Sequence, residues 1–268
     1  MQNSSPFFPH AERRQAIDGV APEPCDTNPR LAWSAYSRVY DVILCRTATY
    51  RTMLCDLLGK SGPLSAICDG RVVLDLGCGT GNLSREILAS YPNTTLIAVD
   101  HDPAMAKVFE EKLSNCLSDK PTPGRAFFME ANITEAMSVL SGMGIKADYV
   151  FLVNVLFLVP DPETMLRQVA GGLCAGGELR LSNPYDKTDL DSLFRSFRLD
   201  LLEQNEFESL ENEFNEFRAF NDMQLSPMLH RFSQELLVGI LKRAGFSKFN
   251  HVSNDHYGGQ SLLISVSI

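Results

Sequence analysis

The chain has 268 residues and a formal net charge of −9, from 24 basic and 33 acidic side chains. This acidic balance argues against a protein held by nucleic-acid phosphates and predicts no nucleic-acid partner. Seven cysteines without a C-x-x-C pair indicate reduced thiols rather than a metal site or a disulfide framework. No apolar run approaches the roughly 18 residues of a membrane span, and no secretory leader is read at the start, so we expect a cytoplasmic protein without membrane contact.

The first part of the chain divides into an arm and a helical segment. Residues 1–30 are rich in proline, asparagine, serine and charge, which predicts a flexible arm. Residues 31–58 are expected to be helical, because Trp33, Tyr36, Tyr40 and Ile43 recur at spacings of three and four. We interpret residues 31–70 as an N-terminal helical cover.

From residue 72 onward, apolar strands alternate with helical segments. The expected strands are 72–76, 95–100, 125–129, 148–155 and 178–182, and the expected helices are 82–91, 103–117, 133–142 and 162–174. This alternation predicts a doubly wound α/β domain with a parallel sheet and helices on both faces.

The pattern changes after residue 183. The tripeptide Asn183-Pro184-Tyr185 is interpreted as a turn, and residues 184–232 as an inserted helical lid. Within the insert, Phe207, Leu210, Phe214 and Phe217 have the 3-4-3 spacing of an amphipathic helix. The segment 186–228 could equally be a contact between two copies of the chain.

The alternation returns near the end of the chain. Ser233 is expected to cap a helix over 234–243, which ends at Gly245. Two strands, 247–252 and 261–267, follow it. Residues 233–268 are therefore read as a C-terminal helix and β-hairpin.

The most informative motif is the glycine loop that follows the first strand. Val72–Leu76 is an apolar strand interrupted only by Asp75, and Gly77, Gly79 and Gly81 follow it as G-x-G-x-G. A dinucleotide site uses G-x-G-x-x-G, so the third glycine comes one residue early. Asp75 places a negative charge beside the loop, which favours an ammonium group over a diphosphate.

A second acid, Asp100, closes the next strand about 20 residues beyond the glycines, the usual reach for binding ribose hydroxyls. The stretch 71–100 resembles the first two motifs of the class I S-adenosylmethionine-dependent methyltransferases of the small-molecule type. The resemblance covers roughly 71–183 and 233–268, with 71–183 as the cofactor-binding core. It implies a Rossmann-like, doubly wound sheet of seven strands, mostly parallel, with the last strand antiparallel and inserted between the fifth and sixth. Residues 31–268 would then form one domain.

The resemblance implies S-adenosylmethionine as cofactor, with S-adenosylhomocysteine as product, and it assigns roles around the glycine loop. The backbone of Gly77, Cys78 and Gly79 would lie against the amino-acid part of the cofactor. Asp75 would face its ammonium group, directly or through water. Asp100 would accept hydrogen bonds from both ribose hydroxyls.

Further cofactor contacts are implied at the ends of the later strands. His101 would stack on the adenine, Asn132 would bond the adenine edge, and Ile133 would pack on the ring. Asn154, at the end of the fourth strand, would lie closest to the transferred methyl group.

The helical cover also carries candidate cofactor residues. Tyr36 and Tyr40 share one helix face in a segment that is similar to helices closing over the cofactor in small-molecule methyltransferases. The same two side chains could instead form an aromatic stripe in the core.

A general base is harder to identify. Leu156 and Phe157 follow the fourth strand, where family members often place a histidine or tyrosine, so we expect an apolar mouth to the site. The candidate catalytic residues are His230, His256 and Tyr257, the last two on a turn expected at the cofactor edge.

We therefore interpret the chain as a methyltransferase acting on a small, partly apolar molecule at O, N or C, by in-line transfer that depends mainly on alignment and desolvation. The alternatives are a macromolecular methyltransferase for protein or RNA, and a non-catalytic S-adenosylmethionine-binding protein.

Overall fold

The computed structural model describes residues 33–117, 125–224 and 230–268, so the arm expected at 1–30 lies outside the described residues. The elements in chain order are α1 (Trp33–Leu44), α2 (Ala48–Leu58), β1 (Val72–Leu76), α3 (Asn82–Ser90), β2 (Thr95–Asp100), α4 (Pro103–Leu117), β3 (Ala126–Glu130), α5 (Ile133–Gly142), β4 (Ala147–Val153), η1 (Leu156–Leu158), α6 (Pro162–Gly172), β5 (Leu173–Pro184), α7 (Leu190–Glu203), α8 (Phe207–Gln224), α9 (Gln234–Ala244), β6 (Lys248–Asp255), α10 (His256–Gly259) and β7 (Ser261–Ser267).

The strands form one seven-stranded sheet in the order β3-β2-β1-β4-β5-β7-β6. β1 to β5 pair in parallel, whereas β7 pairs antiparallel with both β5 and β6. The expected sheet and the insertion of its last strand are therefore confirmed. Because β1 to β5 and β6 run in one direction, their carboxyl ends share one edge, where ligands bind in open α/β sheets.

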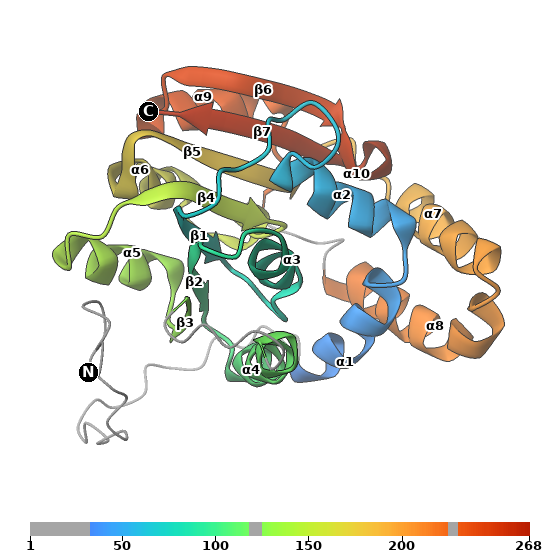
Figure 1. Cartoon of the computed structure of the whole chain (residues 1–268). Helices are drawn as coiled ribbons and strands as arrows, with labels where there is room; N and C mark the ends of the chain where they lie inside the picture. Colours follow the sequence, from blue (N-terminus) through green and yellow to red (C-terminus); the bar gives the residue numbers. More distant parts are fainter. Residues whose placement is uncertain (1–32, 118–124, 225–229) are drawn as a thin grey trace, which may run out of the picture. The chain divides into compact units, whose positions relative to one another are not determined.

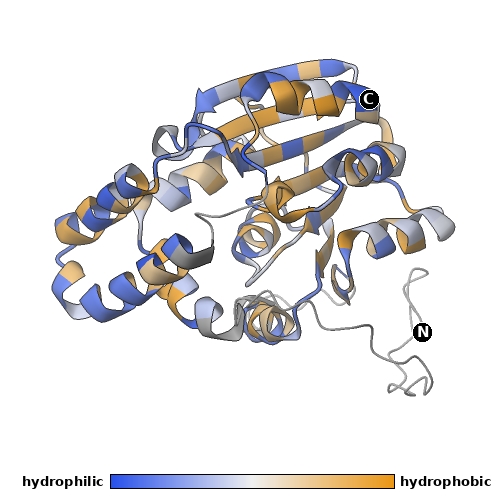
Figure 2. Ribbon diagram, turned by 180° about the vertical axis from the view of Figure 1, so that it is seen from behind, coloured by the Kyte–Doolittle hydropathy of each residue, from blue (hydrophilic) through white to orange (hydrophobic). Residues whose placement is uncertain are grey.

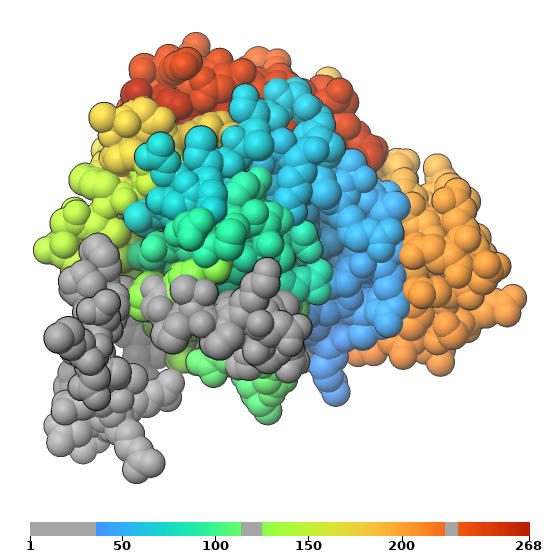
Figure 3. All heavy atoms as spheres, viewed as in Figure 1, coloured from blue at the N-terminus to red at the C-terminus, as the bar shows by residue number. Residues whose placement is uncertain are grey.

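Two hydrophobic cores cover the two faces of this sheet. One contains buried residues of α1, α2, α3, α4, α7 and α8, and the other contains buried residues of α5, α6 and α9. The space-filling view shows α1, α2 and α3, coloured from blue to teal, over the first face (Figure 3). α7 and α8 lie beyond the end of the sheet from which α10 emerges (Figure 1).

The inserted segment folds into two amphipathic helices. Phe207, Phe214 and Phe217 of α8 are buried, as their spacing predicts. Phe194 of α7 packs against both Phe214 and Phe217, with ring centroids 5.8 and 5.4 Å away. Hydrophobic and hydrophilic residues alternate along both helices (Figure 2).

A buried arginine fastens α2 to the sheet. Arg180 of β5 is 1% exposed, and its guanidinium donates to the carbonyls of Leu57 and Ser65 at 2.8 Å. It also pairs with Glu178 at 3.0 Å. A buried charge is tolerated only when it is paired and hydrogen-bonded, so these partners satisfy Arg180 and hold the end of α2 in place.

The helical expectation for 31–58 is confirmed by α1 and α2, which are separated by a turn at 45–47. One local expectation was wrong. Asn183-Pro184-Tyr185 is not a turn, because the first two residues end β5 and pair with β7, and Tyr185 bridges to Phe232. Pairing with neighbouring strands overrides the local turn preference of this tripeptide.

Candidate active site

The glycine loop leaves β1 with its backbone in the left-handed region. Gly77 has φ 72°, and a Cβ there would lie 2.4 Å from Cγ2 of Val155, so no side chain fits. The N–H groups of Gly77 and Cys78 donate to the carbonyl of Val99 at 2.7 and 3.0 Å, which fixes the loop on β2. Gly79 differs, because no atom lies within 4 Å of the position of its Cβ. The loop therefore presents open backbone at Gly79, where a ligand can approach closely.

Asp100 holds this loop from the end of β2. One carboxylate oxygen accepts from the Gly79 N–H at 2.8 Å, and the other accepts from the Asp102 N–H at 3.0 Å. Each carboxylate oxygen has a second lone pair, so Asp100 keeps acceptor capacity for a ligand. The neighbouring His101 has a side chain 70% exposed, with Nδ1 3.8 Å from Asp100 Oδ1.

Asp75 lies inside the strand–helix layer rather than on the surface of the loop. Its carboxylate is 2% exposed and accepts from the hydroxyl of Ser84 at 2.6 Å. The pKa of Asp75 is raised to about 6: burial raises it most, the hydrogen bond from Ser84 lowers it, and the charge of Asp100 raises it. Two carboxylates therefore share one neighbourhood beside the loop, a charge distribution that favours a cationic ligand group.

Asn154 occupies a constrained position at the carboxyl end of β4. Its φ is 55°, a left-handed value uncommon outside glycine, and its N–H donates to the carbonyl of Ser182 at 2.8 Å. Its side-chain Oδ1 is buried and has no hydrogen-bond partner among the residues that the structure describes. Buried acceptors are normally satisfied, so this oxygen is available for a donor on a ligand.

Asn132 and Ile133 lie at the start of α5. Asn132 is exposed and precedes the helix without bonding to it through its side chain. Ile133 is 9% exposed and packs into the core below α5 and α6. Leu156 and Phe157, expected to line an apolar mouth, are also buried in this core, so that expectation was wrong. The short helix η1 turns both side chains inward.

A polar network that the sequence did not suggest connects α1 to the glycine loop. Asp41 of α1 accepts from the Thr80 hydroxyl at 2.7 Å and from the Asn82 side-chain amide at 2.9 Å. Lys112 of α4 pairs with Asp41 at 2.8 Å and donates to Asn82 Oδ1 at 2.6 Å. Thr80 belongs to the loop and Asn82 begins α3, so one carboxylate fixes the geometry of the loop from a separate helix.

Four tyrosines gather next to this network. Tyr36 and Tyr40 have ring centroids 5.2 Å apart, and Tyr50 lies 6.3 Å from both Tyr40 and Tyr257. The Tyr50 hydroxyl accepts from the Asn82 amide at 3.5 Å. Burial raises the pKa values of Tyr40 and Tyr257 well above the usual value, so both hydroxyls stay protonated at neutral pH. The structure thus brings Tyr257 together with Tyr36 and Tyr40.

The two candidate histidines lie elsewhere. His256 is buried under α2, with Nδ1 3.3 Å from Asp56 Oδ2, an ion-pair distance without hydrogen-bond alignment. Burial lowers the pKa of His256, and the charge of Asp56 opposes that shift. His230 stacks on Phe232 at 5.5 Å, and Phe232 belongs to the core on the other face of the sheet. His230, His256 and Tyr257 are therefore not gathered at one point.

Comparison with known proteins identifies the central part of the chain. Residues 74–179 match the family model of a methyltransferase domain. A trans-aconitate 2-methyltransferase of Methylobacterium radiotolerans is 31% identical over 119 residues, which cover 42% of this chain and 38% of the relative. A malonyl-[acyl-carrier protein] O-methyltransferase of Halalkalibacterium halodurans is 49% identical over 45 residues, 17% of each chain. The chain thus spans less than half the length of these curated relatives.

Solved structures agree on the fold. A candidate O-methyltransferase from Nostoc punctiforme superposes with a TM-score of 0.58 at 15% identity, over 87% of this chain and 59% of that one. A candidate S-adenosyl-L-methionine-dependent methyltransferase from Methanococcus maripaludis gives 0.55 at 16% identity, over 93% and 97% of the two chains. At this identity the similarity shows the fold. Within the described residues, the structure has no helix long and apolar enough to cross a membrane.

Proposed function

We propose that the chain binds S-adenosylmethionine and transfers its methyl group to a small molecule. Residues 74–179 match the family model of a methyltransferase domain, and the order and directions of the seven strands are those expected for the class I S-adenosylmethionine-dependent methyltransferases. When bound, S-adenosylmethionine supplies a methyl group on a positively charged sulfonium. The observation that carries the proposal is the edge where the glycine loop, Asp100 and Asn154 meet.

The residues at this edge fit the parts of the cofactor. The open backbone at Gly79 accommodates the amino-acid part, and the charges of Asp75 and Asp100 favour an ammonium group nearby. The free lone pairs of Asp100 suit ribose hydroxyls. The unpaired Oδ1 of Asn154 offers an acceptor at the end of the neighbouring strand.

Alignment and water exclusion are the main catalytic contributions that we propose for this chain. Well-oriented reactants can gain about 7–11 kcal/mol from positioning alone. Tyr36, Tyr40 and Phe217 form an apolar wall contributed by α1 and α8, with Tyr36 and Phe217 stacked at 5.6 Å. In this proposal the α7–α8 pair acts as the lid that closes the acceptor site.

The protonation states favour an acceptor that needs no enzyme base. Tyr257 stays protonated, and His256 is buried against Asp56. A carboxylate is already ionised at neutral pH, and an amine reacts in its neutral form. The names of the two relatives also favour a carboxylate acceptor, because trans-aconitate and a malonyl group carry carboxylic acids. Small carboxylic acids therefore come first among the acceptors to test, followed by amines.

The first test is calorimetric titration of the full chain with S-adenosylmethionine, S-adenosylhomocysteine and NAD. We expect micromolar binding of the first two, loss of that binding in Asp100→Ala, and unchanged binding in Asp186→Asn, an exposed aspartate outside the glycine-loop network. Binding of NAD alone, or full affinity in Asp100→Ala, would contradict the cofactor assignment.

The second test follows transfer of a labelled methyl group to a panel of small carboxylic acids and amines. Turnover on a panel member supports the proposed reaction. Tight cofactor binding with no turnover across a broad panel would instead indicate a binding protein. A dimer contact through residues 186–228 stays a prediction, which the solution mass of the chain would test.

A further inference from the structure

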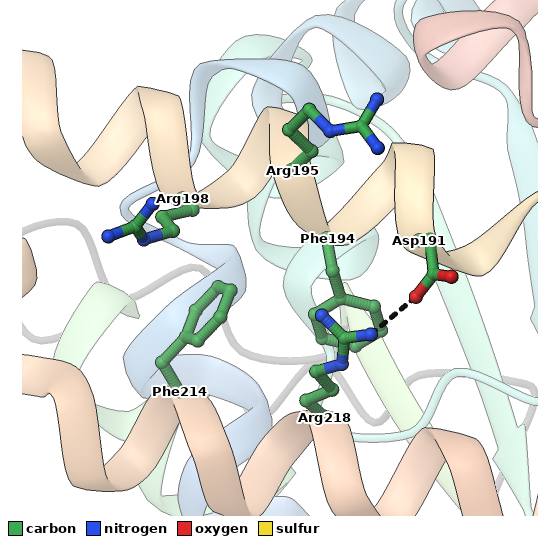
Figure 4. A pocket seen from close by; sticks show the side chains of 6 residues that line it. All are labelled: Asp191, Phe194, Arg195, Arg198, Phe214 and Arg218. Atoms are coloured by element: carbon green, nitrogen blue, oxygen red, sulfur yellow. Dashed lines mark hydrogen bonds and ion pairs between the residues drawn. The ribbon is translucent and has the colours of Figure 1, made fainter.

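A recess lies between the two helices of the inserted segment. It has a volume of about 290 Å³ and opens between α7 and α8. Figure 4 shows its lining, which consists of Asp191, Phe194, Arg195, Arg198, Phe214 and Arg218. This volume is near the lower end for small-molecule pockets, so the recess suits a compact ligand rather than a nucleotide-sized one.

The lining is strongly basic for so acidic a protein. Three arginines surround the recess in a chain with a net charge of −9. Asp191, the acid of the lining, is paired with Arg218, which also lies 3.5 Å from Asp222. Arg195 and Arg198 are exposed, and neither forms an ion pair with another residue in the described part of the chain. The guanidinium of Arg198 lies over the Phe207 ring, 4.7 Å from its centroid. The N–H groups of Arg195 and Arg198 are therefore not used in ion pairs among the described residues, and a ligand at the rim can accept hydrogen bonds from them.

The inner walls of the recess are apolar. Phe194 and Phe214 are 2% and 4% exposed, with ring centroids 5.8 Å apart. The guanidinium of Arg218 lies over the Phe194 ring at 5.6 Å. Planar guanidinium groups bind carboxylates through paired hydrogen bonds, whereas phenyl rings accept an apolar body. Cationic groups above aromatic walls thus match a molecule with a carboxylate at one end and an apolar body at the other.

This recess is separate from the glycine-loop site. None of its six lining residues contributes to the contacts described there. Packed aromatic rings connect the recess to that site. The ring centroids of Phe194 and Phe217 are 5.4 Å apart, and the Phe217 ring stacks on Tyr36 of α1 with centroids 5.6 Å apart. A ligand that bridges α7 and α8 would therefore stabilise the helix pair next to the tyrosine cluster.

We propose that the recess between α7 and α8 binds a small organic carboxylate, at a site additional to those for the cofactor and the methyl acceptor. Arg195, Arg198 and Arg218 hold the carboxylate, and Phe194 and Phe214 contact the apolar body. Asp191 competes with the ligand for Arg218, so it weakens binding. The proposal does not depend on methyl transfer.

The test uses the full chain without S-adenosylmethionine, at low ionic strength, with benzoate as the probe. Binding is followed by NMR through the arginine Nε–H signals, so its outcome is independent of the proposed enzymatic activity. We expect Arg195→Gln combined with Arg198→Gln to weaken benzoate binding by at least about tenfold. Asp191→Asn should tighten it about two- to fivefold, because the competing carboxylate is removed.

The controls separate carboxylate recognition from other causes. Arg243→Gln, at an exposed arginine on α9 paired with Glu163, should leave benzoate binding unchanged. Benzyl alcohol, which lacks the charge, and inorganic phosphate, which lacks the apolar body, should both bind more weakly than benzoate.

Equal binding of benzoate by the double arginine variant would overturn the proposal, as would equal binding of benzyl alcohol or phosphate by the wild-type chain. Weaker binding in Asp191→Asn would contradict the competition between Asp191 and the ligand. Because that variant is expected to gain affinity, general loss of structure cannot imitate the expected result. Thermal unfolding of each variant checks that it is folded.

Discussion

Replacement of Asp41 by alanine should loosen the glycine loop although Asp41 lies on a separate helix. The change removes hydrogen bonds from Thr80 and Asn82 and the ion pair with Lys112. Hydrogen bonds to a charged group contribute about 1.5–3 kcal/mol each, and water partly replaces them here because the Asp41 side chain is 23% exposed. We therefore expect the free energy of unfolding to fall by about 2–4 kcal/mol.

Thermal unfolding and calorimetry measure the two consequences. A loss of this size should lower Tm by about 5–10 °C in a chain of this length. Affinity for S-adenosylhomocysteine should fall at least about tenfold, because the loop must then be ordered by the ligand. Asp186→Ala, at an exposed aspartate outside the network, is the matched control and should change neither quantity.

A double-mutant cycle shows whether the unpaired Lys112 causes part of the loss. Lys112 is 15% exposed, so removing its partner leaves a poorly hydrated charge. Asp41→Ala with Lys112→Met should therefore be more stable than the sum of the two single changes predicts. Wild-type Tm and wild-type cofactor affinity in Asp41→Ala would refute the role of this network.

The remaining predictions concern the loop and its acids. Asp100→Ala should abolish measurable binding of S-adenosylhomocysteine in calorimetry, because the Gly79 N–H loses its acceptor together with the ribose contact; retained binding would contradict this. Gly77→Ala should destabilise the fold by about 2–4 kcal/mol in denaturant unfolding, because its Cβ meets Val155 at 2.4 Å, and Val155→Ala should recover part of that loss. The raised pKa of Asp75, about 6 in the folded chain, means that stability falls as pH rises from about 4 to 6. Asp75→Asn should remove that dependence. The free energy of unfolding of the variant, relative to that of wild type, should therefore increase by up to about 3 kcal/mol between pH 4 and pH 6. Parallel curves of Tm against pH for the two proteins would show that the pKa of Asp75 is not raised.

Much of the fold follows from local patterns in the sequence. Apolar runs of five to eight residues predicted the strands, and helical spacing predicted α3 to α6, α8 and α9 to within a few residues. The glycine loop and Asp100 could also be predicted from the sequence, because tight turns and strand ends depend on neighbouring residues. Similarity to a family supplied the order of the last strands, which no local pattern contains.

The candidate site was predicted less completely. The burial of Asp75 and its hydrogen bond from Ser84 were not foreseen, and its role toward the ammonium group of the cofactor stays a prediction. Leu156 and Phe157 were expected at the mouth of the site, but a short helix turns them into the core. Hydrophobicity indicates that such side chains avoid water, but it does not specify whether they pack in the core or line the mouth of a site.

The sequence by itself determined the strand–helix alternation, the left-handed glycine loop and the acid at the end of β2, because each depends on residues close together in the chain. Only the tertiary structure placed Asp41 on Thr80, across 39 residues, and put the guanidinium of Arg180 on the carbonyl of Leu57, across 123. It also buried His256 against Asp56, where the sequence suggested a catalytic group. These contacts depend on which helices pack on which face of the sheet, and that choice is made by the whole hydrophobic core rather than by the spacing of any one segment.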